Sequence, residues 1–305
     1  MKTEAEPWIA ARMESGFDER VKGQPIYYEH YRADSPKGTI VISHGFTESV
    51  TKFTEAIYYM LQAGYDVWGL DHRGHGRSYR QNSNPFVVHA ERFDDYVQDL
   101  KHLTETLVIP ASEGRKVFVY GHSMGGCIAA RLIEEEPLLF DKAVLTSPML
   151  GLSFSLPVPV VYAAASLKGI GEKRKEPLSP VSAFPSEPDF EGSCDSSECR
   201  YLYYFEKRRK DPRLQTTSAS IGWGKEAAKA CAKVCSRHET EKIRIPVLLF
   251  QAGNDTVVKN AAQTLFASRV RDCVLTTVPG MKHELYMTDS AVLIPYWERI
   301  FGFLG

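Results

Sequence analysis

The chain has 305 residues, and its 37 Lys and Arg against 38 Asp and Glu give a formal net charge of −1 at pH 7. This balance offers no global attraction to nucleic acid, and we expect no nucleic-acid partner. Apolar residues make up 43% of the chain, enough for one large α/β domain with an insertion. The acidic N-terminus lacks the apolar run of a signal peptide, and the uncharged stretch 151–167 is short and contains two prolines. We therefore expect a soluble, cytoplasmic protein.

The predicted elements alternate over the first half of the chain. Short β-branched runs predict strands at 38–45, 65–70, 116–121 and 142–148, and apolar residues at helical spacing predict helices at 53–64, 93–107 and from residue 123 onward. Buried strands separated by amphipathic helices indicate an α/β fold with a mostly parallel sheet and helices on both faces.

This alternation stops after Pro148. Residues 151–240 are rich in proline and polar residues and contain several short helical pieces. Strands return at 245–253 and 273–278, with a helix near 259–269 between them and an apolar helix at the C-terminus. We predict a core formed by residues 1–150 and 241–305, interrupted by an insertion at 151–240.

The stretch "GHSMG" places Ser123 between two glycines where a strand turns into a helix. Gly-x-Ser-x-Gly in this setting is typical of a nucleophile elbow, in which the serine hydroxyl projects above the sheet. A plain glycine-rich turn is the alternative, because the bare motif also occurs by chance.

A nucleophilic serine needs a base and an acid, which in α/β-hydrolases follow it in the order acid, then histidine. Only His238 and His283 follow Ser123, and His238 falls in the insertion. His283 follows the strand at 273–278, and Asp255 follows the preceding strand. Each could be an ordinary loop residue, but both stand at the required strand ends. We predict Ser123, Asp255 and His283 as the catalytic triad.

An oxyanion hole for this serine requires two backbone N–H donors. Met124 follows the nucleophile and is the first candidate, and Phe46, in the loop after the strand at 38–45, is the second. Removing one such donor typically costs about 100- to 1,000-fold in rate.

Several segments together resemble the monoacylglycerol lipase and lysophospholipase branch of the α/β-hydrolases, in particular lysophospholipase L2-type proteins. They are "HG" (44–45), "DHRGHGRS" (71–78), "GHSMGG" (121–126), "GNDTVV" (253–258) and "KHEL" (282–285). The resemblance implies an α/β-hydrolase fold with a mainly helical cap, here 151–240, inserted after the sixth strand. It implies a serine hydrolase without cofactor or metal, with the triad and oxyanion residues predicted above. "DHRGHGRS" is a structural loop in this family, so Asp71 and His75 are not catalytic candidates.

The predicted function is hydrolysis of carboxylic esters of single-chain acyl lipids, a monoacylglycerol or a lysophospholipid, through an acyl-enzyme. A neutral glycerol or simple ester is ranked slightly above a lysophospholipid. Two alternatives stay open: a non-lipid esterase, thioesterase or related hydrolase with the same triad, and a slow-turnover ligand receptor on the same fold. The sequence does not specify an oligomeric state.

Two features of the cap allow more than one interpretation. The apolar segment 152–167 suits either the wall of an acyl channel or ordinary packing. The aromatic and basic segment 200–210 suits either transient contact with a membrane surface, which would make the protein peripheral to the membrane, or a helix packed on the core with a solvated charged face. The second interpretation is favoured.

Four of the six cysteines also fall in the cap. They are Cys194, Cys199, Cys231 and Cys235, and the other two are Cys127 and Cys273. We expect packed, reduced thiols, with a zinc site or a disulfide as the alternative.

Overall fold

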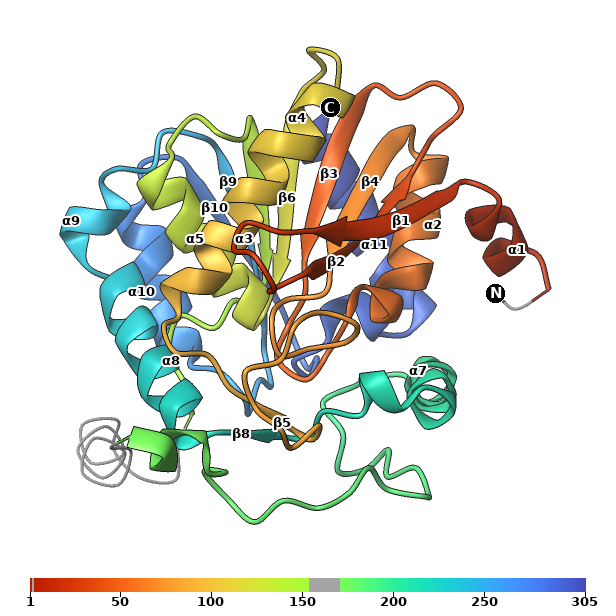
Figure 1. The fold of residues 1–305 in the computed structure, drawn as a ribbon. Coiled ribbons are helices and arrows are strands. Elements are labelled where there is room, and N and C mark those ends of the chain that lie inside the picture. The colour runs from red at the N-terminus through yellow and green to blue at the C-terminus, as the bar shows by residue number, and fades with distance from the viewer. Residues whose placement is uncertain (2, 154–170) are drawn as a thin grey trace.

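One eight-stranded sheet forms the centre of the computed structural model, which describes residues 1, 3–153 and 171–305 (Figure 1). The strand order is β1-β2-β4-β3-β6-β7-β9-β10. The strands are β1 (Met13–Asp18), β2 (Ile26–Tyr31), β3 (Gly38–Ser43), β4 (Tyr65–Leu70), β6 (Val117–His122), β7 (Lys142–Thr146), β9 (Val247–Ala252) and β10 (Cys273–Val278). Pairing is antiparallel at β1–β2 and β2–β4 and parallel at the other neighbours. The predicted α/β class with a mostly parallel sheet is confirmed.

Helices cover both faces of this sheet (Figure 1). The α-helices are α1 (Ala5–Ala10), α2 (Thr54–Gln62), α3 (Asp94–Leu103), α4 (Ile109–Ala111), α5 (Met124–Glu135), α7 (Glu198–Lys210), α8 (Ile221–Val234), α9 (Arg237–Thr240), α10 (Asn260–Arg269) and α11 (Ser290–Leu304). Two buried apolar clusters result. One joins α3, α5, α8 and α10 to the sheet, and the other joins α1, α2 and α11 to it.

The predicted elements match the structure closely where the chain alternates between strand and helix. The helix expected at 93–107 is the main exception, because α3 ends at Leu103 and a π-helical turn, η2 (Thr104–Val108), continues the chain. The two N-terminal strands are missing from the sequence-based prediction. β1 is mostly exposed and carries almost none of the apolar alternation that reveals a strand.

The span 151–240, predicted as the cap, begins after β7, the sixth strand of the main sheet along the chain. Its described elements are the 3-10 helices η3 (Gly171–Lys175) and η4 (Pro212–Leu214), the short strand β8 (Ser218–Ala219), α7, α8 and α9. β8 pairs in parallel with β5 (Val87–Val88) of the core. Most of the apolar segment 152–167 lies outside the described residues.

Helix α7 is attached to the core through charged side chains. Arg200 donates to both carboxylate oxygens of Glu55 at 2.8 and 2.9 Å, and Lys207 pairs with Glu6 at 2.7 Å. Tyr204 and Phe205 of the same helix are buried. Figure 1 shows α7 and β8 along the same end of the sheet.

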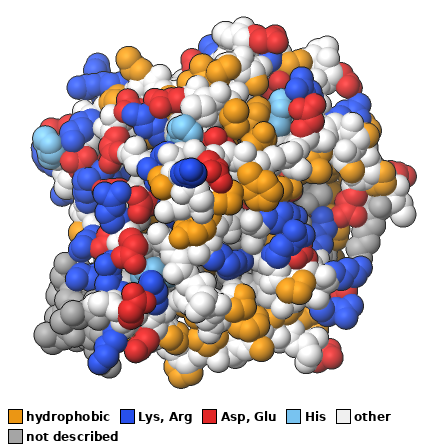
Figure 2. Space-filling model, viewed as in Figure 1, with side chains coloured by type: hydrophobic (Ala, Val, Ile, Leu, Met, Phe, Trp, Pro, Cys, Tyr) orange, Lys and Arg blue, Asp and Glu red, His pale blue; other side chains and the backbone are white. Residues whose placement is uncertain are grey.

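Charged side chains of both signs are interspersed over the face of the molecule drawn in Figure 2. Among the described residues, no helix combines the length and the apolar character needed to cross a membrane.

Candidate active site

Ser123 stands at a sharp turn between β6 and α5. Its φ of 51° and ψ of −117° lie outside the usual regions for a residue with a side chain. The glycines around it permit the turn. A Cβ on Gly121 would lie 2.7 Å from the Gly125 carbonyl oxygen, and a Cβ on Gly125 would lie 2.0 Å from the Ser43 carbonyl oxygen. The elbow therefore needs glycine at both positions, and Gly125 lets the end of β3 lie directly against the start of α5.

The backbone around Ser123 is fixed by neighbouring segments. Its N–H donates to the Thr146 carbonyl at 3.1 Å, and its carbonyl accepts from Met149 N–H at 2.8 Å. Met124 is the first residue of α5, so its N–H is one of those for which a helix provides no acceptor. The positive end of the helix dipole adds a favourable field for negative charge at this position.

Asp255 and His283 form a close pair. The Nδ1 of His283 lies 2.6 Å from Oδ2 of Asp255, and both side chains are almost fully buried. The other oxygen, Oδ1, accepts from the N–H groups of Val257 and Val258 at 2.8 and 3.0 Å, which fixes the carboxylate. A carboxylate at Nδ1 holds the proton there, so Nε2 is free to accept one.

The pair lies next to the elbow. The imidazole of His283 is centred 4.9 Å from that of His122, the residue that precedes Ser123. The turn after β6 and the loops after β9 and β10 thus converge. A serine nucleophile, a base and an orienting acid, if they act together, have to be supplied by such neighbouring segments.

The loop of Phe46 is held by two polar side chains. His44 accepts from His72 N–H through Nε2 at 2.9 Å, so its Nδ1 carries the proton and donates to the Gly45 carbonyl at 2.7 Å. Glu48 accepts from Gly45 N–H at 2.6 Å. The Gly45 carbonyl and the Phe46 N–H belong to one planar peptide, so the His44 contact orients the predicted oxyanion donor, and the Glu48 contact fixes the peptide before it.

A buried ionic cluster, which sequence reasoning missed, borders these groups. Lys52 pairs with Glu48 at 2.7 Å and with Glu284 at 3.0 Å, and Glu284 pairs with His122 at 3.0 Å. Burial by itself would lower the pKa of Lys52, but the charges of Glu284 and Glu48 raise it well above its usual value. Burial likewise opposes the charged form of His122, and Glu284 and Glu48 outweigh it and raise its pKa. The i,i+4 spacing of Glu48 and Lys52 was the one available signal.

The same cluster bears on metal binding. Ligand atoms of His122, His283 and Glu284 lie within 4.8 Å of one another, the one such group among the described residues. Each of the three already has an ionic or hydrogen-bonded partner in Asp255, Lys52 or its neighbour in the group. We interpret them as hydrogen-bonding and ion-pair residues.

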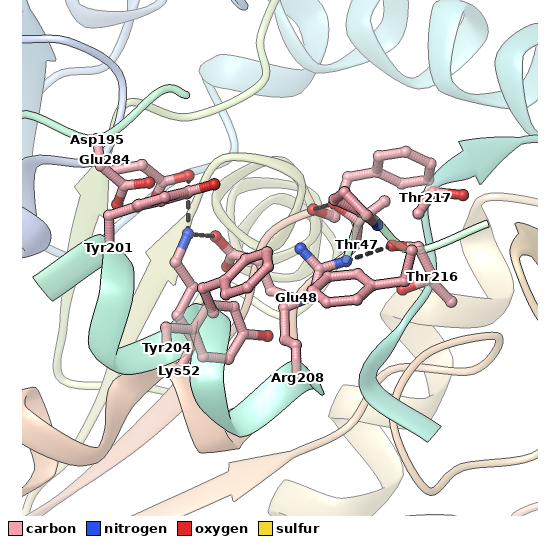
Figure 3. Close-up of a pocket in the computed structure, with 14 residues that line it drawn as sticks. Thr47, Glu48, Lys52, Asp195, Tyr201, Tyr204, Arg208, Thr216, Thr217 and Glu284 are labelled. Atoms are coloured by element: carbon pink, nitrogen blue, oxygen red, sulfur yellow. Dashed lines mark hydrogen bonds and ion pairs between the residues drawn. The ribbon is translucent and has the colours of Figure 1, made fainter. Parts of the chain in front are cut away.

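A cavity of about 270 Å³ opens beside these residues (Figure 3). Its walls come from 46–52 of the core, from 184–217 of the predicted cap, and from Glu284. The cavity lies next to the predicted site, because Phe46, the predicted oxyanion residue, and Glu284, the neighbour of His283, both line it.

The other candidates occupy structural positions. His238 lies in α9, where its side chain is 82% exposed and next to Glu239. Asp71 accepts from Val50 N–H at 2.8 Å and from Arg77 N–H at 2.9 Å, so it braces two loops. His75 is fully buried, and burial lowers its pKa well below the usual value, with the charge of His44 adding to the effect.

All six cysteines are free thiols in the structure. Two cysteines on α8 contact the segment after β7: Cys231 donates to the Met149 carbonyl at 3.3 Å and Cys235 to the Leu150 carbonyl at 3.5 Å. Burial raises the pKa of Cys235 to about 12, so this thiol is protonated at neutral pH.

The fold and this site define an α/β-hydrolase. Residues 34–290 match the family described as serine aminopeptidase, S33, and the chain belongs to this family of hydrolases. The chain is 28% identical over 257 residues to lysophospholipase L2 of Escherichia coli (strain K12), covering 84% of this chain and 73% of that protein. It is 27% identical over 282 residues to monoacylglycerol lipase of Mycolicibacterium smegmatis, covering 90% and 91%.

Solved structures show the same fold. The monoacylglycerol lipase of Paleococcus ferrophilus superposes with a TM-score of 0.69 at 22% identity, covering 92% of this chain and 98% of that one. A carboxyl esterase from Bacillus coagulans, in complex with glycerol, gives a TM-score of 0.78 at 18% identity, covering 96% and 97%. The predicted family resemblance is confirmed.

Proposed function

We propose that the protein hydrolyses carboxylic esters of single-chain acyl lipids through an acyl-enzyme on Ser123. His283 acts as the base, Asp255 orients it, and the N–H groups of Phe46 and Met124 form the oxyanion hole. The observation that carries the proposal is the 2.6 Å contact of His283 Nδ1 with Asp255, beside a serine held on a strained turn.

In the proposed reaction, the Oγ of Ser123 attacks the ester carbonyl carbon while Nε2 of His283 takes its proton. The carbonyl oxygen becomes an oxyanion and receives hydrogen bonds from the two backbone N–H groups. The imidazolium, stabilised by Asp255, then protonates the leaving alcohol. A water molecule, deprotonated by the same imidazole, cleaves the acyl-enzyme and restores the serine.

The substrate class is supported by the relatives, which are named lysophospholipase L2 and monoacylglycerol lipase. Both names denote enzymes that act on esters with one acyl chain. The cavity beside Phe46 and Glu284 is slightly smaller than the ~300–1,000 Å³ typical of small-molecule pockets. It suits the alcohol part of such an ester better than a whole lipid.

The test is a series of monoacylglycerols and p-nitrophenyl esters of increasing chain length. Each buried methylene adds about 0.8 kcal/mol, so kcat/KM should rise about fourfold per methylene until the acyl site is full. A fluorophosphonate should label the wild-type protein at Ser123. Fastest turnover of acetate esters, with no gain on lengthening the chain, would contradict the lipid assignment and leave a small-ester hydrolase.

A further inference from the structure

Resting on the proposed function, we propose that the cavity beside Phe46 is a headgroup subsite that selects a zwitterionic phosphodiester alcohol, such as glycerophosphoethanolamine, over a neutral glycerol. Arg208 binds the phosphate, and Asp195 binds the ammonium group at the opposite wall.

The cavity has two chemically different sides. In Figure 3, Asp195 and Glu284 lie together on one side, while Thr216 and Thr217 lie on the other, with Arg208 on their side of the view. Phe46 also lines the cavity. With Phe46 as the proposed oxyanion donor, a leaving group that occupies the cavity would lie next to the scissile ester.

Arg208 is the cationic residue of the second side. Its Nε donates to the Leu214 carbonyl at 3.0 Å and its Nη2 to the Thr216 carbonyl at 2.7 Å. The guanidinium carbon also lies 4.7 Å from the centre of the Phe184 ring. These contacts fix the side chain, and Nη1 makes no hydrogen bond to the described residues. A fixed guanidinium with a spare donor is well suited to a phosphate oxygen.

The neighbouring basic residues do not share this position. Lys207 pairs with Glu6 at 2.7 Å. Arg209 pairs with Glu206 at 2.8 Å, and its side chain is 53% exposed. Of the basic cluster 207–210, only Arg208 lines the cavity. Arg209 therefore provides a matched control of the same charge on the same helix.

Four residues on the cavity walls, Asp195, Tyr204, Thr216 and Glu284, each carry a buried polar atom with no hydrogen-bond partner among the described residues. Two of these atoms stand at the two sides of the proposed subsite: Oγ1 of Thr216, whose residue is 1% exposed, and Oδ1 of Asp195, whose residue is 7% exposed. Buried polar atoms are nearly always paired in native proteins. A ligand with hydrogen-bond acceptors near Thr216 and donors near Asp195 satisfies both atoms.

Asp195 is the surplus charge of the first side. Lys52 already pairs with Glu48 and Glu284, and Glu284 pairs with His122. Burial raises the pKa of Asp195 to about 7, Lys52 opposes this effect, and Glu284 adds to it. An ammonium group would stabilise the ionised carboxylate, and the ring of Tyr201 on the same wall adds a surface that attracts cations.

A neutral glycerol would compensate the charge at neither end. It would cover Arg208 and Asp195 without charge compensation, and leaving a charged group desolvated and unpaired is costly. The subsite therefore discriminates against neutral alcohols.

The first test compares lysophosphatidylethanolamine with a monoacylglycerol of the same acyl chain. Arg208→Gln should lower kcat/KM for the lysophospholipid about 10- to 100-fold, the range for a hydrogen bond to a charged group, and change the monoacylglycerol value less than about threefold. Arg208→Lys should recover part of the loss, and Arg209→Gln should change neither substrate. Equal losses on both substrates, or no loss on the lysophospholipid, would overturn the role of Arg208.

A second variant guards against misfolding of Arg208→Gln, because that residue also ties α7 to the chain after it. Thr216→Val removes a hydroxyl without removing those bonds, and it should lower lysophospholipid turnover selectively, by about threefold to tenfold. Asp195→Asn should reduce the preference for lysophosphatidylethanolamine over lysophosphatidylglycerol. An unchanged preference would remove the ammonium half of the proposal.

A binding measurement separates the subsite from catalysis. In calorimetry, the Ser123→Ala variant should bind glycerophosphoethanolamine more tightly than glycerol 3-phosphate. It should bind glycerol and inorganic phosphate more weakly than either. Equal binding of inorganic phosphate and glycerophosphoethanolamine would indicate a free-anion site and overturn the headgroup assignment. Binding without hydrolysis of any ester by the wild-type protein would refute the proposed function and leave the subsite standing.

Discussion

The two ends of helix α5 both bury charged side chains, and they do so with different results. At the N-terminal end, His122 is part of the cluster of Glu284, Lys52 and Glu48. At the other end, Arg131 is fully buried and pairs with Glu134, with Glu135 at 2.5 Å and with Glu239 at 3.0 Å.

The surroundings distinguish these clusters. The N-terminal cluster borders a cavity, the strained serine and the Asp255–His283 pair. The partners of Arg131 come from α5 itself and from α9, so that cluster ties two helices together. Buried charge alone therefore does not mark a functional site. Charge beside a cavity with unmatched polar atoms is the stronger indicator.

The largest effect should come from Ser123. Ser123→Ala should lower kcat for ester hydrolysis by about a million-fold, because only oxyanion and binding contributions remain. Thermal unfolding should change little, since one hydroxyl is lost. Substantial residual activity, or fluorophosphonate labelling elsewhere, would disprove the nucleophile.

The next largest effect on activity should distinguish the two histidines that follow the serine. His283→Ala should be nearly inactive, because it removes the proposed base for the serine proton. His238→Ala, at an exposed position on α9, should keep near wild-type kcat/KM. An inactive His238 variant alongside an active His283 variant would reverse our assignment of the base.

The two ionic clusters can be compared directly. Lys52→Met and Arg131→Met each remove a buried cation from the carboxylates that pair with it, and each should cost about 3–5 kcal/mol of unfolding free energy. Only Lys52→Met should also reduce kcat in the folded fraction, by about tenfold or more, because Glu48 accepts from Gly45 N–H and so holds the loop that carries Phe46.

Lys52→Arg and Arg131→Lys serve as charge-preserving controls for this pair. Denaturant unfolding and active-site-titrated kinetics are the measurements. If both Met variants lose kcat equally, the distinction between a site cluster and a structural cluster is wrong.

The smallest expected effect is on the pH dependence of stability. Its sign should differ between the clusters at the two ends of helix α5. Asp195 faces Lys52, Glu284, Glu48 and His122, and its pKa of about 7 lies above the usual 3.8. The folded protein then binds more protons than the unfolded chain between about pH 4 and 7, so stability falls as pH rises through this window. Asp195→Asn should remove this slope.

Glu239 behaves in the reverse sense. Burial would raise its pKa, but hydrogen bonds from Lys242 and Arg131 outweigh burial and lower it. Its contribution to stability is present above its unfolded pKa of about 4.5 and is lost as pH falls through its folded value. Relative to wild type, the Tm of Asp195→Asn should increase from pH 4 to pH 8, and that of Glu239→Gln should decrease from pH 3.5 to pH 6. Shifts of about 2–4 °C are expected, and shifts of the same sign would contradict this account.

Much of the fold and the predicted positions of the site residues follow from the sequence. Gly-x-Ser-x-Gly at the end of a strand specifies a turn within five residues, because only glycine fits where a Cβ would meet the Ser43 carbonyl oxygen. Parallel strands all end at one edge of a sheet, so Asp255 and His283, each following a strand, could be expected beside Ser123. β1 escaped prediction because an exposed edge strand has little apolar pattern to detect.

The cavity walls were decided only by the tertiary structure. Glu48 and Lys52, Asp195, Arg208, Thr216 and Glu284 lie far apart in the chain, and their meeting depends on how α7 and β8 dock against the core. In the sequence, Arg208 is one of four consecutive basic residues. It differs from the others because the rotation of α7 turns its side chain toward the cavity and the chain after the helix supplies carbonyls to fix it. Local turn chemistry is set by neighbouring residues, whereas the identity of a ligand depends on side chains that only packing brings together.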